Sequence, residues 1–242
     1  MKIMQKIAAK ANHLLEEPIP TIAFLGDSVT QGCFEIYRKN DGDIETVFDP
    51  SCAYHAYLAQ KLHTLCPSAP VNIINAGISG DSAPSGARRL ERDVLCHHPD
   101  LTVVSYGLND SSLGLSGIGK YTDALADIFC RLTEAGSEVI FMTQNMMNTT
   151  ISPFLPKEPV FRECAEGAAR TQNEGILKAY YEAAKKVALD AGVKICDVYA
   201  IWERMAENGI DTTALLANHI NHPTREMNHL FADSLLRVML EP

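Results

Sequence analysis

Five short apolar runs recur along the chain, at residues 21–25, 71–75, 101–105, 138–143 and 193–196. Each run is brief and rich in Ile, Val or Phe. Short continuous apolar runs of this kind are typical of strands that are buried on both faces of a sheet. The pattern therefore predicts five buried strands.

Segments with helical periodicity lie between and after these runs, notably residues 53–65, 84–95, 121–135, 172–191 and 223–240. Alternating strands and helices are typical of an α/β fold, in which helices cover both faces of a parallel sheet. Gly136 and Gly192 each follow a helical segment and precede a strand, where a helix end in the left-handed conformation favours glycine. A chain of 242 residues without internal repeats or low-complexity linkers favours a single domain over residues 1–242.

The first 17 residues carry apolar positions at helical spacing, namely Ile3, Ile7, Ala11, Leu14 and Leu15. Such a stripe either packs on its own domain or lies on a membrane surface, and we favour a packed helix. The segment lacks the run of roughly 7 to 15 apolar residues that forms the core of a signal peptide. We therefore expect a cytoplasmic protein without stable membrane insertion.

Residues 33–50 and 144–167 fit neither the strand pattern nor the helix pattern. Long irregular segments in a compact α/β domain are often functional. The alternative is that they are variable surface loops, and the sequence leaves both possibilities open.

The composition is that of an ordinary soluble globular protein, with 46% hydrophobic and 21% charged residues. Lys and Arg number 21 against 30 for Asp and Glu, which gives a net charge of −9, and no stretch is rich in Lys and Arg. This charge disfavours nucleic acid as a partner. The seven cysteines form no CxxC pair and are odd in number, so we expect free thiols in a reducing compartment.

Polar residues directly follow three of the predicted strands, at the sheet edge where the reactive loops of parallel α/β folds lie. Ser28 lies in the loop after the first strand, Gly80 in the loop after the second and Asn109 in the loop after the third. His222 stands just before the last helical segment. These four residues are the candidate site.

Acyl transfer explains why these residue types would be used together. A neutral serine hydroxyl is a poor nucleophile, so Ser28 needs an imidazole such as His222 to take its proton. The oxyanion of the tetrahedral intermediate needs fixed donors, each worth roughly 3 to 4 kcal/mol. The backbone N–H of Gly80 and the side-chain amide of Asn109 are suitable donors.

Four ordered motifs resemble those of the SGNH (GDSL) hydrolases: Gly26-Asp27-Ser28, Gly80 within residues 77–81, Gly107-Leu108-Asn109-Asp110, and His222-Pro223. The resemblance covers the chain from about residue 21 onward. It implies a three-layer α/β/α sandwich with a five-stranded, flavodoxin-like parallel sheet. It also implies Ser28 as nucleophile, His222 as base, and an oxyanion hole formed by Ser28 N–H, Gly80 N–H and Asn109. It implies no metal ion and no organic cofactor.

The chain departs from the family pattern at one position. Family members usually place an aspartate three residues before the histidine, and here that residue is His219. An imidazole does not replace the charge of a carboxylate, but any acceptor, including a backbone carbonyl, can hold the tautomer. We therefore predict a Ser-His dyad, with His219, Asn218, Glu226 or another carboxylate as the alternative orienting groups.

The chain also contains candidates for two other kinds of site, a phosphate-binding loop and a zinc site. Residues 114–121 nearly spell the phosphate-binding loop of a nucleotide hydrolase, but Tyr121 stands where that loop needs Ser or Thr. The spacing of His219, His222 and His229 matches no usual zinc pattern. A catalytically silent binding module is the third alternative.

The sequence therefore predicts a serine esterase that forms an acyl-enzyme on Ser28 and acts on a small-molecule ester. We expect short acyl groups, such as acetyl, on a polar alcohol or carbohydrate. Lysophospholipase or thioesterase activity on the same fold is the alternative, and the sequence makes no prediction of the oligomeric state.

Overall fold

The computed structural model describes residues 1–241 and contains a five-stranded parallel sheet in the order β4-β1-β5-β6-β7. The strands are β1 (Thr21–Gly26), β4 (Asn72–Gly77), β5 (Leu101–Ser105), β6 (Glu138–Thr143) and β7 (Lys194–Asp197). Every residue of β1 and β5 is buried, as expected for strands near the middle of a covered sheet. All five predicted strands are confirmed, with ends that differ by two residues at most.

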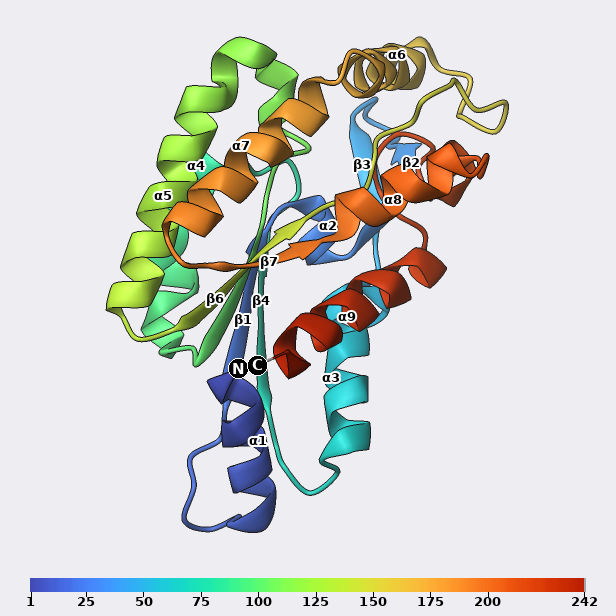
Figure 1. Cartoon of the computed structure of the whole chain (residues 1–242). Coiled ribbons are helices and arrows are strands. Elements are labelled where there is room, and N and C mark those ends of the chain that lie inside the picture. Colours follow the sequence, from blue (N-terminus) through green and yellow to red (C-terminus); the bar gives the residue numbers. More distant parts are fainter. Residues whose placement is uncertain (242) are drawn as a thin grey trace.

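Helices cover both faces of this sheet, so the fold is a three-layer α/β/α sandwich (Figure 1). One layer contains α4 (Ala83–Asp93), α5 (Ile118–Glu134) and α7 (Ile176–Asp190). The other contains α3 (Tyr54–Leu65) and α9 (Arg225–Leu240), which pack against each other, and α8 (Val198–Glu207) packs on α9. The predicted α/β class is confirmed.

The amino-terminal helix α1 (Lys2–Asn12) is shorter than predicted. Its Ile3 and Ile7 side chains are buried in the main hydrophobic core, and its first N–H groups donate to the carboxylate of Glu138. Leu14 and Leu15 lie beyond the end of the helix and are 47% and 95% exposed. The packed stripe therefore ends with the helix, where Ala11 is the last of the five predicted positions that packs against the core. Among residues 1–241, no helix is both long and apolar enough to cross a membrane.

The two segments that fitted neither pattern contain regular structure. Residues 33–50 form an antiparallel hairpin of β2 (Cys33–Arg38) and β3 (Ile44–Phe48), a separate two-stranded sheet. Residues 144–167 lead into α6 (Pro159–Asn173), which begins with proline at its first position. Both elements lie at the carboxyl ends of the strands, on the side of the short helix α2 (Ser28–Gln31) (Figure 1).

The predicted glycine helix ends are also confirmed. Gly136 and Gly192 have φ values of 84° and 68°, and they end α5 and α7 just before β6 and β7. These tight ends return the chain to the start of the next strand, so that successive strands all point toward the same edge.

Candidate active site

Ser28 is the first residue of α2, which follows the interior strand β1 with only Asp27 between them. The Oδ1 atom of Asp27 accepts a hydrogen bond from Val29 N–H at 3.0 Å and so caps the helix. Gly32, with a φ of 94°, ends the helix after one turn. The N–H of Ser28 is at the first position of the helix, where no intrahelical acceptor exists, so it is available to an oxyanion.

The side chains of Ser28 and His222 meet although 194 residues separate them. The Nε2 atom of His222 lies 3.0 Å from Ser28 Oγ, and both side chains are buried. The Nδ1 atom of His222 lies 2.8 Å from the backbone carbonyl oxygen of Phe34 in β2. Because a carbonyl only accepts, Nδ1 carries the proton, and Nε2 of the neutral ring is left to accept from the Ser28 hydroxyl.

A compact turn before α9 presents the His222 ring. The Oδ1 atom of Asn218 accepts from the N–H groups of Ile220, Asn221 and His222 at 2.8 to 3.0 Å. The backbone of Ala217 closes the turn by donating to His222 O at 2.7 Å. Asn218 therefore holds the loop that carries the ring, through the backbone and not through Nδ1.

None of the three predicted orienting side chains accepts from Nδ1 of His222. Asn218 is engaged with its own turn, Glu226 is exposed on α9, and the Nδ1 atom of His219 is buried with no hydrogen-bond partner in the described part of the chain. His219 has a φ of 56°, so its residue lies at a turn in the left-handed region. The acceptor is instead the backbone carbonyl of Phe34. A backbone carbonyl was among the predicted kinds of acceptor, but the sequence did not indicate which residue supplies it.

Burial sets the charge state of the ring. Removal from water lowers the pKa of His222 from 6.5 to about 4, against the opposing effects of the Phe34 carbonyl and the negative charge of Glu35. At neutral pH the ring is therefore uncharged and has a free lone pair on Nε2. This is the state that a general base requires.

The two predicted oxyanion donors are held together by hydrogen bonds between their loops. One amide N–H of Asn109 donates to Asp81 O at 2.8 Å, and the backbone N–H of Ala83 donates to Asp110 Oδ1 at 3.0 Å. Gly80, the residue before Asp81, has a φ of 76°. A Cβ atom added to Gly80 would meet no atom within 4 Å. The turn therefore needs glycine for its backbone conformation, and the space beside Gly80 is open to a ligand.

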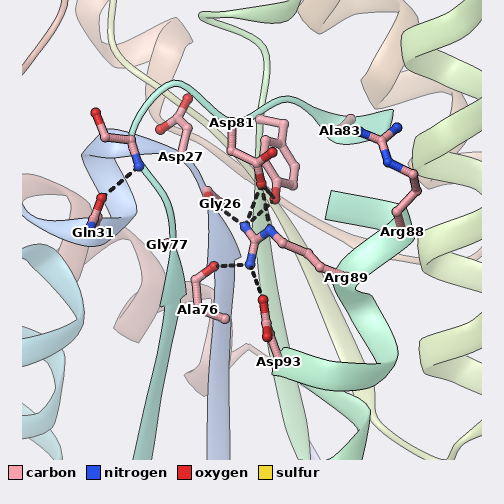
Figure 2. Close-up of polar contacts among 12 residues, drawn as sticks. Gly26, Asp27, Gln31, Ala76, Gly77, Asp81, Ala83, Arg88, Arg89 and Asp93 are labelled. Atoms are coloured by element: carbon pink, nitrogen blue, oxygen red, sulfur yellow. Dashed lines mark hydrogen bonds and ion pairs between the residues drawn. The ribbon is translucent and has the colours of Figure 1, made fainter. Parts of the chain in front are cut away.

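A buried arginine anchors these loops from below, as Figure 2 shows. The guanidinium of Arg89, which is 7% exposed, contacts five groups: the carboxylates of Asp81 (2.6 Å) and Asp93 (3.1 Å), the backbone oxygens of Gly26 (3.0 Å) and Ala76 (2.7 Å), and the hydroxyl of Tyr106 (2.8 Å). It thereby ties together the ends of β1 and β4 and Asp81, the residue after Gly80. Sequence reasoning missed this residue, because an arginine on a helical segment gives no sign that it is buried.

Asp27 is a second buried group that sequence reasoning did not assign. Its Oδ1 atom also accepts from Gln144 Nε2 at 2.8 Å, whereas Oδ2 has no hydrogen-bond partner among residues 1–241. Burial raises the pKa of Asp27 from 3.8 to about 7. The carboxyl therefore takes up a proton as the solution becomes mildly acidic, and Oδ1 can accept the Val29 and Gln144 hydrogen bonds in either protonation state.

A cleft of about 610 Å³ opens beside the two oxyanion donors. Gly80, Asn109 and Asn221 lie at the end nearest the candidate site, and Lys120 of α5 and Glu163 of α6 also line the cleft. Its volume falls within the range of about 300 to 1,000 Å³ that is usual for small-molecule sites. The helix α6, which the sequence analysis missed, supplies one wall.

The rival sites do not assemble. Tyr121 is buried, and its hydroxyl donates to Tyr106 O at 2.9 Å, so it is not placed to ligate a magnesium ion. The ring of His229 stacks on Tyr57, with 3.7 Å between the ring centroids, away from the Ser28 contact of His222. Within residues 1–241, no group of three or more His, Cys, Asp or Glu side chains is arranged to hold a metal ion.

Similar proteins with known structures share the fold. A two-domain esterase active on acetylated mannans superposes with a TM-score of 0.68 at 18% identity, covering 99% of this chain and 54% of that one. A variant of an acetyl-xylooligosaccharide esterase from Geobacillus superposes with a TM-score of 0.66 at 20% identity, covering 92% of this chain and 95% of that one.

Proteins with similar sequences include two esterases. The chain is 29% identical to an acetylxylan esterase of Geobacillus stearothermophilus over 89 residues, which are 37% of this chain and 39% of that protein. It is 30% identical to an arylesterase of Vibrio mimicus over 100 residues, which are 38% of this chain and 48% of that protein. The matched segments thus span less than half the length of these two relatives. The sequence profile of the GDSL-like lipase/acylhydrolase family matches residues 24–230, and the chain belongs to that family.

Proposed function

We propose that the protein is a serine esterase that hydrolyses short-chain, in particular acetyl, esters of a polar alcohol such as a carbohydrate. The observation that carries this proposal is the 3.0 Å contact between Ser28 Oγ and His222 Nε2, with Nδ1 protonated against a carbonyl oxygen. This geometry suits removal of the Ser28 proton during attack on an ester carbonyl.

The reaction follows from the placement of these groups. As Ser28 Oγ bonds to the ester carbon, its proton moves to His222 Nε2, and the carbonyl oxygen becomes an oxyanion near the donors of Ser28, Gly80 and Asn109. The oxyanion then re-forms the carbonyl as the bond from the carbon to the alcohol oxygen breaks, and the protonated ring gives its proton to the leaving alcohol, so that an acetyl group remains on Ser28. Water, deprotonated by His222, then attacks the acyl carbon, the bond to Ser28 Oγ breaks, and the ring returns the proton to Ser28 as the acid is released.

Protonation of the His222 ring is the step that this site makes costly in free energy. A ring whose pKa is lowered to about 4 accepts a proton at an energetic cost, and no carboxylate contacts Nδ1 to offset it. The Phe34 carbonyl contributes its dipole, and the carboxylate of the neighbouring Glu35 adds a favourable longer-range interaction. We propose that these two groups serve in place of the usual aspartate.

The chemistry of the cleft favours a polar alcohol. Its walls combine apolar side chains such as Leu113 and Met147 with groups that can bond to hydroxyls, including Ser112, Lys120, Glu163 and Thr171. Relatives named as acetylxylan esterase, and structural neighbours named for acetylated mannans and xylooligosaccharides, add support for an acetylated carbohydrate.

Hydrolysis of p-nitrophenyl esters from acetate to octanoate tests the proposal, with Ser28→Ala as the control. We expect kcat/KM to be highest for acetate, release of acetate from acetylated xylo-oligosaccharide, and no activity above background with Ser28→Ala. An optimum at octanoate would favour the lysophospholipase alternative over the short-chain esterase. Absence of turnover with every ester would contradict the esterase and favour a silent binding module.

We also propose a reducing, cytoplasmic location. All seven cysteines are free thiols, which is usual for proteins of a reducing compartment. The substrate would then be a small ester or oligosaccharide that has entered the cell.

A further inference from the structure

Arg225 connects the loop that carries His222 to the hairpin that carries the Phe34 carbonyl. It is the first residue of α9, three positions after the histidine. Its guanidinium nitrogens lie 2.6 and 3.2 Å from the two carboxylate oxygens of Glu35 and 3.1 Å from Asp49 Oδ2. The same guanidinium sits over the Phe34 ring, 4.2 Å from its centroid.

The Phe34 carbonyl needs such support because the sheet ladder does not hold it. The pairing of β2 with β3 shifts register between Cys33 and Ile36, so Phe34 and Glu35 lie in a bulge. A bulge re-aims the groups of the bulged strand, and here the Phe34 carbonyl points at His222. The hairpin is also a separate two-stranded sheet, an arrangement with little stability of its own.

The contacts of Arg225 surround this bulge. Two of them reach consecutive residues of β2, Phe34 and Glu35, and the third reaches Asp49 just after β3. The planar guanidinium can satisfy one carboxylate with two parallel hydrogen bonds, reach a second and stack on a ring at the same time, which a lysine ammonium cannot do.

We infer that Arg225 is a positioning residue for the proposed base: by clamping Phe34, Glu35 and Asp49, it holds the Phe34 carbonyl oxygen against Nδ1 of His222. The role of His222 as base rests on the proposed function, whereas the clamp itself is a property of the fold. A carboxylate would hold an imidazole partly by its charge. A backbone carbonyl can orient the imidazole only if its own backbone segment is held in place. The orientation of His222 therefore depends on the clamp at Phe34.

The effect of losing the clamp should appear in the chemistry more than in the stability. The side chains of Arg225, Glu35 and Asp49 are 30%, 46% and 30% exposed, and ion pairs that remain in contact with solvent contribute little to folding. A displaced catalytic group, in contrast, can cost on the order of 10²-fold in rate for a shift of about 1 Å. Arg225→Met should therefore lower kcat by about 10- to 100-fold with little change in KM.

Arg237→Met is a matched control on the same helix. Arg237 pairs with Glu241 at 3.7 Å in the last turn of α9, and its side chain is 84% exposed. The substitution removes an arginine ion pair remote from the hairpin, so kcat should stay at the wild-type value. Arg225→Lys, which keeps the charge but loses the fork, should fall between wild type and Arg225→Met.

Proton NMR tests the clamp without reference to activity. A hydrogen-bonded Nδ1–H of a buried histidine gives a downfield resonance, which is assigned here by its loss in His222→Ala. We expect this resonance in wild type and Arg237→Met, and its broadening or loss through faster exchange with water in Arg225→Met. An unchanged resonance together with unchanged kcat in Arg225→Met would overturn the inference. If no variant hydrolyses esters but the resonance behaves as expected, the clamp stands and the proposed esterase function fails.

Discussion

Replacing His222 by alanine should lower kcat on an acetyl ester by roughly 10⁴-fold or more, because the Ser28 hydroxyl then has no base. The ring that contacts Ser28 Oγ at 3.0 Å is also the only imidazole placed to protonate the leaving alcohol among the described residues. Steady-state kinetics on p-nitrophenyl acetate measures the loss, and circular dichroism checks that the variant is folded.

His219→Ala is the matched control for this prediction. His219 stands at the position where the family usually has its aspartate, but the N–H group at Nδ1 of His222 donates its hydrogen bond to Phe34 O instead. We therefore expect His219→Ala to leave kcat close to the wild-type value. Equal losses in His219→Ala and His222→Ala, both correctly folded, would contradict the Ser-His dyad.

Asn109→Ala should lower kcat by about 10²- to 10³-fold, the usual effect of removing one oxyanion donor. One N–H of the Asn109 amide holds Asp81 O at 2.8 Å, and this leaves its second N–H for the oxyanion. The bond to the oxyanion is strongest in the transition state, so KM should change little. Kinetics on p-nitrophenyl acetate provides both parameters.

Loss of the Asp81 contact could also disturb the loop, and thermal unfolding separates the two effects. A variant that keeps its unfolding midpoint and KM but loses kcat supports an oxyanion donor. A small loss of kcat, below about tenfold, would mean that Ser28 N–H and Gly80 N–H suffice and that Asn109 only holds the loop.

The sheet was predictable because its signals are local. A buried strand such as β1 is a continuous apolar run, and the rule that parallel strands end at one edge then places Ser28, Gly80 and Asn109 near one another. The hairpin β2–β3 was missed because its strands mix apolar and polar residues and form no continuous apolar run. The hairpin is only partly buried, and Phe48, for example, is 47% exposed. Asp41-Gly42, a usual hairpin turn pair, was the signal that could have found it.

The partner of His222 could not be identified from residue types. Every residue has a backbone carbonyl, so nothing in the letter at position 34 distinguishes Phe34 as an acceptor. Its placement depends on a bulge and on an arginine 191 residues away, as counted from Phe34 to Arg225. Helix α6 did carry a signal, since Pro159 is followed by apolar residues at 161, 165 and 168, as in a helix that begins with proline.

Reaction with a fluorophosphonate, followed by peptide mapping, tests most directly whether Ser28 is a nucleophile activated by His222. The reagent loses fluoride when a serine oxygen attacks phosphorus, so it marks the activated hydroxyl. We predict one adduct per chain, on Ser28 in wild type, no adduct in Ser28→Ala, and labelling slowed by orders of magnitude in His222→Ala. No adduct, or an adduct on another serine such as Ser79 or Ser82, would contradict the account.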